Sequence, residues 1–256
     1  MPDDPHPGHT ADRDPDLDAR IAPLDLALRE RIAALDAASV CDGAAAAGVA
    51  VGVPDPAIRL LSGAERMAGV ARPAACDDDF LAVWWGIDRV RAGEVLVISA
   101  GSRAVVGELF ASEAARKHVA GIVVDGWCRD VAHLRRSALP VYARGTTPQA
   151  GSANVARPEP GAVEVGGVTV TAGDLVLGDA DGVVVVPRAA VETVVAAAEA
   201  VQRREAAMLE TILAGGSVFA HTTLREHWAA RLAGEASVLG VWGSATSGNE
   251  VEQRHQ

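Results

Sequence analysis

The sequence lacks several features that would mark a secreted, membrane-spanning or nucleic-acid-binding protein. It has only three cysteines, an odd number without metal-ligand spacing, so we expect neither a disulfide framework nor a cysteine-based metal site. No apolar run approaches the roughly 18 residues of a membrane-spanning helix, and residues 1–20 lack the apolar core of a secretory signal. Asp and Glu outnumber Lys and Arg by 34 to 23, whereas nucleic-acid binding needs a basic face. We therefore expect a cytoplasmic protein that binds neither membrane nor nucleic acid.

Aromatic residues are also scarce, at 4%, but hydrophobic residues make up 49% of the 256-residue chain. The chain can therefore bury a sizeable core built mainly of Ala, Val and Leu. Residues 1–20 are rich in Asp, Pro and His, and the last residues are polar. The composition predicts a disordered N-terminal tail over 1–20, a single α/β domain over 21–243 and a flexible C-terminal tail over 244–256.

The fold class follows from short apolar runs that alternate with helical patterns. Runs at 95–98, 121–125 and 139–142 are typical of strands buried on both faces. Helical segments at 107–119 and 131–136 separate them, and this βαβαβ rhythm predicts a mixed, largely parallel sheet flanked by helices. The alternation around Gly166-Gly167 predicts a hairpin. Further expected elements are helices at 23–35, 39–50, 80–90, 189–213 and 222–232 and strands at 173–178 and 182–187. Ser39 is the expected N-cap of the second of these helices.

The candidate chemistry is concentrated between residues 107 and 145. Gly107 opens a predicted helix, so the backbone amides of Glu108, Leu109 and Phe110 are donors without helical acceptors. Such helix N-termini bind carboxylates and phosphates. These residues are therefore candidates for substrate binding.

The second group of candidate residues follows the strand predicted at 121–125. Asp125-Gly126 is a typical turn pair, and Arg129-Asp130 would project just beyond it, where ligands of α/β sheets bind. The planar guanidinium of Arg129 matches a carboxylate or keto oxygen. The carboxylate of Asp130 is the kind of oxygen ligand that Mg²⁺ or Mn²⁺ prefers. Trp127 is a candidate for shaping the same pocket.

Each of these patterns also has a structural reading. Arg129 and Asp130 can form a simple surface ion pair, and for Asp125 a structural role in a turn is favoured over a ligand role. For Asp77-Asp78-Asp79, a solvated loop or a helix cap is favoured over a metal cluster. Trp84-Trp85 is expected in the core or in a subunit interface.

Three ordered motifs resemble the RraA-like family, which includes class II 4-hydroxy-4-methyl-2-oxoglutarate aldolases and oxaloacetate decarboxylases. The most specific motif is Gly121-x-Val-x-Asp-Gly-x-x-Arg-Asp130, followed by Pro140-Val-x-Ala-Arg-Gly145. A second stretch is Gly173-Asp-Leu-Val-x-Gly-Asp-Ala-Asp-Gly-Val-Val-Val-Val-Pro187, and a weaker one is Ser39-Val-x-Asp42. The resemblance covers roughly residues 24–215. It implies a swivelling β/β/α fold that assembles as a homotrimer or a dimer of trimers.

The resemblance also implies roles for individual residues. Arg129 would anchor the pyruvyl part of a substrate, Asp130 would ligate Mg²⁺ or Mn²⁺, and the amides of residues 107–110 would hold the substrate carboxylate. Asp42 matches a carboxylate that approaches the site of a neighbouring subunit. A further acidic residue near the C-terminus does not align, and Glu205 is a candidate for it.

The function implied by the resemblance is that of a metal-dependent lyase. It would cleave 4-hydroxy-2-oxo acids such as 4-hydroxy-4-methyl-2-oxoglutarate to pyruvate and a carbonyl product, and it would also decarboxylate oxaloacetate. The alternative is a non-catalytic regulator that binds a ribonuclease or another protein. A third possibility is an enzyme of the same kind with an unusual substrate.

Overall fold

The computed structural model describes residues 15–240, and the chain forms two compact units. The first ends at Ala198 and the second begins at Glu199, whereas one domain over 21–243 was expected. Residues 1–14 and the predicted tail at 244–256 lie outside the described residues.

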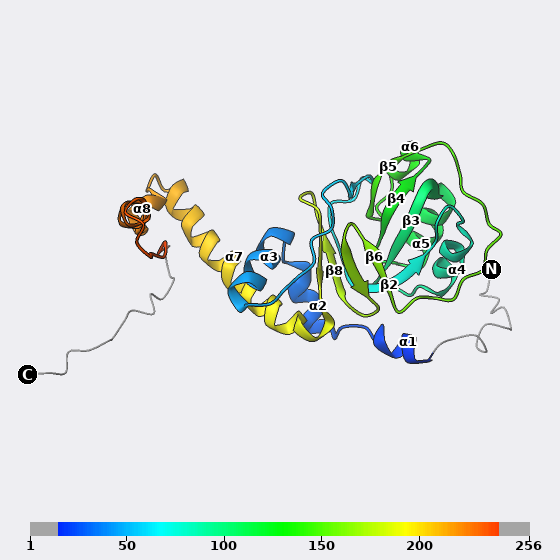
Figure 1. Ribbon diagram of the computed structural model, residues 1–256, viewed down its shortest axis with the longest axis horizontal. Coiled ribbons are helices and arrows are strands. Elements are labelled where there is room, and N and C mark those ends of the chain that lie inside the picture. The colour runs from blue at the N-terminus through cyan, green and yellow to red at the C-terminus, as the bar shows by residue number, and fades with distance from the viewer. Residues whose placement is uncertain (1–14, 241–256) are drawn as a thin grey trace, which may run out of the picture. The chain divides into compact units, whose positions relative to one another are not determined.

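The first unit is built on a seven-stranded sheet with the order β1-β5-β4-β3-β2-β8-β9 (Figure 1). Its strands are β1 (Arg59–Leu60), β2 (Met67–Ala75), β3 (Glu94–Val106), β4 (Gly121–Cys128), β5 (Val141–Thr146), β8 (Leu175–Gly178) and β9 (Val183–Val186). The four central strands, β5, β4, β3 and β2, are parallel, and β1, β8 and β9 join them in antiparallel pairs. The predicted mixed α/β sheet is confirmed.

Helices cover the outer face of this sheet in two groups. Over β3, β4 and β5 lie α4 (Leu81–Arg89), α5 (Glu108–Arg116) and α6 (Val131–Leu134). Over β2, β8 and β9 lie α1 (Pro15–Arg20), α2 (Leu26–Ala33), α3 (Ala37–Ala47) and the first part of α7 (Val191–Leu213).

The inner face of the sheet is closed by a hairpin. The strands β6 (Ala162–Val165) and β7 (Val168–Thr171) are joined at Gly166 and Gly167, which both have positive φ. Their valines pack on inward-facing residues of the sheet, including Val95, Val97 and Tyr142. Alternate side chains of β3 thus pack under the helices or under the hairpin, because successive strand side chains point to opposite faces of the sheet. This hairpin was predicted from the sequence.

The N-terminal prediction needs a correction. Residues 15–20 form the helix α1, in which Leu17 is buried and Asp18 pairs with Arg72 at 3.0 Å. Arg72 lies in β2 with no exposed surface, and it also contacts Glu94 at 2.7 Å and Glu159 at 2.9 Å. The acidic composition that suggested a tail thus serves, at Asp18, to neutralise a buried cation.

The cap of α3 also differs from the prediction. Asp36 is the N-cap and accepts the amide of Ser39 at 2.7 Å, while Ser39 itself lies buried inside the helix. The Asp179 carboxylate accepts the amide of Ala37 at 2.8 Å. Small residues let α7 approach closely, since a Cβ placed on Gly43 would lie 2.4 Å from the backbone nitrogen of Ala198.

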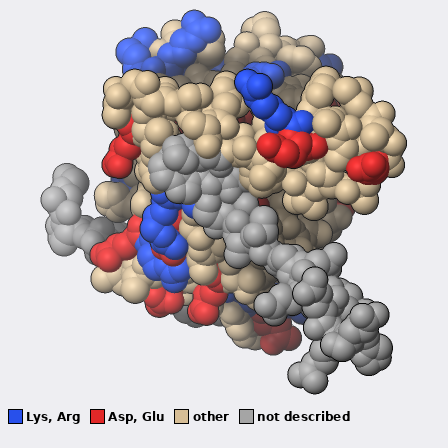
Figure 2. Space-filling view, turned by 90° about the vertical axis from the view of Figure 1, so that its left-hand side faces the viewer, with Lys and Arg blue, Asp and Glu red and all other residues tan. Residues whose placement is uncertain are grey.

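The second unit contains the remainder of α7, a short 3-10 helix at Val218–His221 and α8 (Leu224–Leu232). Gly215, with φ of +83°, follows the end of α7, as expected for a helix terminated by glycine. Among residues 15–240, no helix has the length and apolar character needed to cross a membrane. On the face drawn in Figure 2, acidic and basic side chains are interspersed among uncharged ones.

Candidate functional site

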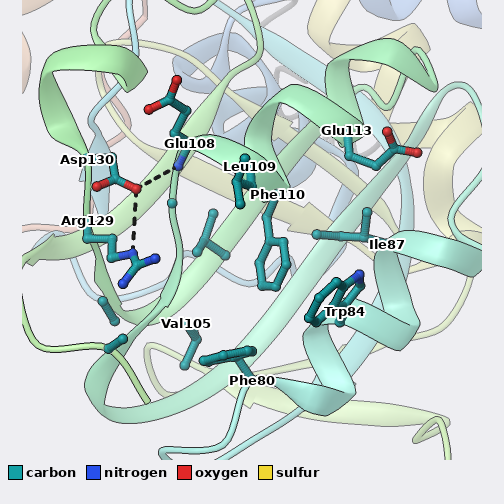
Figure 3. Close-up of a pocket in the computed structure, with 14 residues that line it drawn as sticks. Phe80, Trp84, Ile87, Val105, Glu108, Leu109, Phe110, Glu113, Arg129 and Asp130 are labelled. Atoms are coloured by element: carbon teal, nitrogen blue, oxygen red, sulfur yellow. Dashed lines mark hydrogen bonds and ion pairs between the residues drawn. The ribbon is translucent and has the colours of Figure 1, made fainter. Parts of the chain in front are cut away.

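A cavity of about 400 Å³ opens where β3 and β4 end and α5 begins (Figure 3). It is lined by Phe80, Trp84, Ile87, Ala104, Val105, Val106, Gly107, Glu108, Leu109, Phe110, Glu113, Arg129, Asp130 and Ala150. All the predicted substrate-binding residues are therefore in one place, together with Arg129 and Asp130.

The strand β4 reaches this cavity by a route that differs from the predicted turn. It continues through Asp125 and Gly126 to Cys128, with a shift in its register against β5 between Val124 and Trp127. Arg129 follows directly, and its amide donates to the carbonyl of Val106 at 2.9 Å. The ends of β3 and β4 are thus joined beside the cavity.

Asp130 is held in an unusual backbone conformation. Its φ of 57° and ψ of 39° lie in the left-handed region, which is uncommon for a residue other than glycine. The carboxylate Oδ2 accepts the amide of Glu108 at 3.0 Å, so it lies against the N-terminus of α5, where a negative charge is favoured. Strained residues of this kind concentrate at functional sites.

Gly107 makes this arrangement possible. A Cβ placed on it would lie 2.5 Å from Asp130 Oδ2 and 2.9 Å from Arg129 Cγ. Its φ of −147° is open to any residue, so the requirement for glycine comes from the close approach of the two side chains.

Arg129 and the helix N-terminus provide donors for an anionic ligand. The Arg129 side chain is 44% exposed, and its Nε lies 3.5 Å from Asp130 Oδ2. Within the described chain this contact leaves the two terminal guanidinium nitrogens for a ligand. The first-turn amides of Leu109 and Phe110 lack helical acceptors. An oxo acid can therefore receive hydrogen bonds from both sides of this end of the cavity.

Glu108 is linked to a histidine on α6. Its Oε1 lies 3.3 Å from His133 Nδ1, and the other ring nitrogen of His133 lies 3.2 Å from Ser112 Oγ. These contacts tie α5 to α6 beside the cavity. The sequence offered no signal for this pairing, because its members come from two helices.

The opposite wall of the cavity is apolar. The Phe110 ring lies between Phe80 and Trp84, with centroid distances of 5.8 and 5.5 Å. Trp84 is 57% exposed and lies on the cavity, so it is not in the core, and the other expectation, a subunit interface, stays a prediction. Trp127, expected to shape the pocket, is not among the described lining residues, and its ring packs over Gly145 instead.

Other candidate carboxylates lie elsewhere. Asp42 is exposed on α3 and does not line the cavity, while Glu205 belongs to the second unit. Asp125 pairs with Arg144 and accepts the amide of Gly166 at 2.7 Å, which is a structural role.

The aspartates at 77–79 also have structural partners. Asp78 accepts the amides of Ser102 and Arg103, and Asp79 accepts the amide of Leu81 at the start of α4. Asp77 pairs with Arg157. A structural role is therefore confirmed, although Phe80 is the N-cap of α4 and Asp79 is buried.

Cys128 is unsuited to nucleophilic chemistry. The thiol is buried, and burial raises its pKa to about 12. It therefore stays protonated at neutral pH, whereas the thiolate is the reactive form.

The donor set fits a weakly coordinated divalent cation. Among residues 15–240, no group of three His, Cys, Asp or Glu side chains could hold a metal. Asp130 is 40% exposed, and Oδ2 makes both its contact with the Glu108 amide and its contact with Arg129, which leaves Oδ1 as the oxygen for a cation. Mg²⁺ is commonly held by one or two carboxylates, several waters and the substrate, and Asp130 meets this requirement.

Comparisons with known proteins agree with this fold. The model of the RraA-like family, described as Aldolase/RraA, matches residues 37–185, which include Asp42, Arg129, Asp130 and the start of α5. The chain is 34% identical, over 169 residues, to a protein of Halalkalibacterium halodurans named "Putative 4-hydroxy-4-methyl-2-oxoglutarate aldolase". That alignment covers 61% of this chain and 79% of the relative.

Two solved structures are similar throughout most of their length. An uncharacterized protein from Pseudomonas syringae superposes with a TM-score of 0.66 and 26% identity, covering 77% of this chain and 96% of that one. RraAS2 of Streptomyces coelicolor, described as an unusual member of the RNase ES inhibitor RraA protein family, superposes with a TM-score of 0.60 and 27% identity. That match covers 71% of this chain and 96% of RraAS2. Since the family model matches more than half of the sequence, the chain belongs to the RraA-like family.

Proposed function

We propose that the protein is a divalent-metal-dependent carbon–carbon lyase that cleaves 4-hydroxy-2-oxo acids to pyruvate and a carbonyl product. One observation carries the proposal: Arg129 and Asp130 converge on the N-terminus of α5 across Gly107, at one end of a cavity. The relative named for 4-hydroxy-4-methyl-2-oxoglutarate supports the choice of substrate class.

The chain's own residues bind and orient the substrate in this scheme. The amides of Leu109 and Phe110 receive the carboxylate, and Arg129 donates to the 2-oxo group. Asp130 would hold a divalent cation, which would supply Lewis-acid stabilisation of developing negative charge. Asp130 Oδ2 accepts the Glu108 amide, so the Asp130 carboxylate is held beside the amides at the start of α5.

Cleavage also needs a base for the 4-hydroxyl proton. Glu108 and Asp130 are the two carboxylates that line this end of the cavity, and we assign the proton transfer to Glu108, whose partner is His133. As the 4-hydroxyl proton moves to Glu108, the C4 oxygen forms a carbonyl and the C3–C4 bond breaks. The electron pair of that bond moves into the enolate of pyruvate, and return of the proton to C3 releases pyruvate. Decarboxylation of oxaloacetate yields the same enolate, so we include it in the proposal.

The test is pyruvate release from 4-hydroxy-4-methyl-2-oxoglutarate and from oxaloacetate with Mg²⁺ or Mn²⁺, before and after chelation. Asp130→Asn should lower kcat/KM by at least about a hundredfold, because it removes charge from the site. Asparagine tolerates the left-handed conformation, so the backbone should be kept. Asp77→Asn, at an exposed carboxylate outside the cavity, is the matched control. No turnover of any 2-oxo acid by folded, metal-loaded protein would refute the proposal.

We also propose a homotrimer or a dimer of trimers in which Asp42 completes a neighbouring site. Its exposure on α3, away from the cavity of its own chain, supports this arrangement. Light scattering gives the mass of the assembly. If the site is shared, mixing the inactive variants Asp42→Ala and Asp130→Asn under subunit exchange should restore part of the activity. A mixture that stays inactive would contradict the shared site.

A regulator of a ribonuclease is the second candidate, favoured by the likeness to RraAS2 and by the net charge of −11. A basic ribonuclease segment is the partner that this charge favours. If the protein inhibits RNA cleavage by a ribonuclease and the Asp130→Asn variant still does so, regulation is supported. If a pull-down captures no ribonuclease, regulation is contradicted.

A further inference from the structure

The cavity has two ends of different chemistry. Arg129, Asp130 and the start of α5 form the polar end, while Phe80, Trp84 and Phe110 form the other wall (Figure 3). The Phe110 ring contacts the other two rings at centroid distances of 5.8 and 5.5 Å. A ligand that is anchored at the polar end and extends along the cavity therefore meets aromatic faces.

The charges of the cavity disfavour a second anionic group on the ligand. Among the described lining residues, three are acidic (Glu108, Glu113 and Asp130) and only Arg129 is basic. Glu113 lies on the side away from Arg129 (Figure 3). Its ion pair with Arg116 lowers its pKa, so it is ionised at neutral pH.

The nearby cations of α5 and its C-cap are already engaged. Both Nε and a terminal nitrogen of Arg116 contact the Glu113 carboxylate, at 2.9 and 2.6 Å. Lys117 Nζ donates to the carbonyls of Ile87, at 2.7 Å, and Asp88 at the end of α4. Among the described residues of this chain, the distal carboxylate of a diacid would therefore face aromatic rings and an ionised Glu113 and would find no basic lining residue beyond Arg129, which is unfavourable.

The size of the cavity allows a bulky tail. Cavities of roughly 300–1,000 Å³ hold drug-sized ligands, and this one is about 400 Å³. A small oxo acid at Arg129 leaves room for a ring, which would bury apolar surface against Trp84 and Phe110 and gain from ring–ring contact.

We propose that this enzyme prefers 2-oxo acids that carry a single carboxylate and an apolar, aromatic-sized tail over the dicarboxylates processed by a 4-hydroxy-4-methyl-2-oxoglutarate aldolase. The inference rests on the proposed function for the polar end of the site. Trp84 and Phe110 determine specificity through the tail, and Glu113 excludes a second carboxylate.

Equilibrium binding to the metal-loaded protein tests the preference without turnover. Calorimetric titration with pyruvate, phenylpyruvate and 2-oxoglutarate should give a Kd for phenylpyruvate at least about tenfold below that for 2-oxoglutarate. Trp84→Ala should weaken phenylpyruvate about tenfold and leave pyruvate unchanged. Trp228→Ala, at another exposed tryptophan in the second unit, should change neither.

Removing the charge of Glu113 should strengthen the binding of a diacid. Glu113→Gln should tighten 2-oxoglutarate several-fold with no effect on pyruvate, because only the diacid carries a second carboxylate for Glu113 to repel. Tighter binding of 2-oxoglutarate than phenylpyruvate by the wild type, or equal weakening of all ligands by Trp84→Ala, would overturn the inference. So would the absence of binding by all three acids.

The two proposals can fail separately. The aryl substrate 4-hydroxy-4-phenyl-2-oxobutanoate would release pyruvate and benzaldehyde on C3–C4 cleavage. Selective phenylpyruvate binding without any cleavage would refute the lyase and retain the apolar subsite. Faster cleavage of the diacid than of the aryl substrate would keep the lyase and refute the subsite.

Discussion

Replacing Gly107 with alanine separates the geometry of the site from the stability of the fold. The new Cβ would lie 2.5 Å from Asp130 Oδ2 and 3.2 Å from Arg129 Nε, so both side chains must move. They are 40% and 44% exposed and can do so without disturbing the core. Displacement of a catalytic group by about 1 Å can cost about a hundredfold in rate. We therefore expect kcat/KM for 2-oxo acids to fall about a hundredfold.

The stability of this variant should change little. The backbone of Gly107 suits alanine, which even restricts the unfolded chain and contributes about 0.4–1 kcal/mol. The variant also loses the hydrogen bond from the Glu108 amide to Asp130, which offsets this gain. A net change within about 1 kcal/mol shifts Tm by no more than roughly 2–4 °C.

Pyruvate release and thermal unfolding are measured on the same preparations. Gly161→Ala is the matched control, because a Cβ there meets only the Arg20 side chain, at 3.8 Å. It should keep both activity and Tm. Full activity in Gly107→Ala would show that the close approach of Arg129 and Asp130 to α5 is irrelevant to catalysis. Loss of activity together with a large fall in Tm would show that the effect is structural.

Three further substitutions test the fold. Gly43→Ala places a methyl group against the backbone of Ala198, so urea titration should show a loss of about 1–3 kcal/mol in unfolding free energy. Arg72→Met leaves the buried Glu94 without its cation, while Asp18 keeps Arg91 and Glu159 keeps Arg89, and should cost about 3–5 kcal/mol. Arg116→Gln, at an exposed pair, should cost under about 1 kcal/mol. Asp79 accepts hydrogen bonds that outweigh its burial and lower its pKa from 3.8 to about 2. The contribution of Asp79 to folding stability is therefore present above about pH 4 and lost as the pH falls towards 2. In a plot of urea midpoint against pH, Asp79→Asn should flatten the curve between these two values.

The sequence was most informative where local patterns determine structure. Apolar runs located β3, β4 and β5, because strands buried on both faces need continuous hydrophobic residues. The same logic failed at Asp125-Gly126, where a turn pair lies inside β4. There the Asp125 carboxylate is held by Arg144 and by the amide of Gly166, and these contacts with β5 and the hairpin override the local preference.

The polar end of the cavity could be predicted from the sequence, but the aromatic wall could not. Gly107 to Phe110 and Arg129-Asp130 are each contiguous and sit at the ends of predicted strands, so adjacent parallel strands bring them together. Phe80, Trp84 and Phe110 come from α4 and α5, and no spacing indicates which faces of two helices meet over a sheet. The pairing of Glu108 with His133 could not be predicted for the same reason.

This division also predicts how the site can change. Backbone geometry positions the polar end: the left-handed Asp130, the missing Cβ of Gly107 and the first-turn amides of α5. Few substitutions are compatible with it. The aromatic end depends on exposed or half-buried side chains of α4 and α5, which can vary without strain. Substitutions at Trp84 should therefore alter the choice of substrate and leave pyruvate formation from a small oxo acid intact, and an equal loss for every substrate would show that the two ends act as one unit.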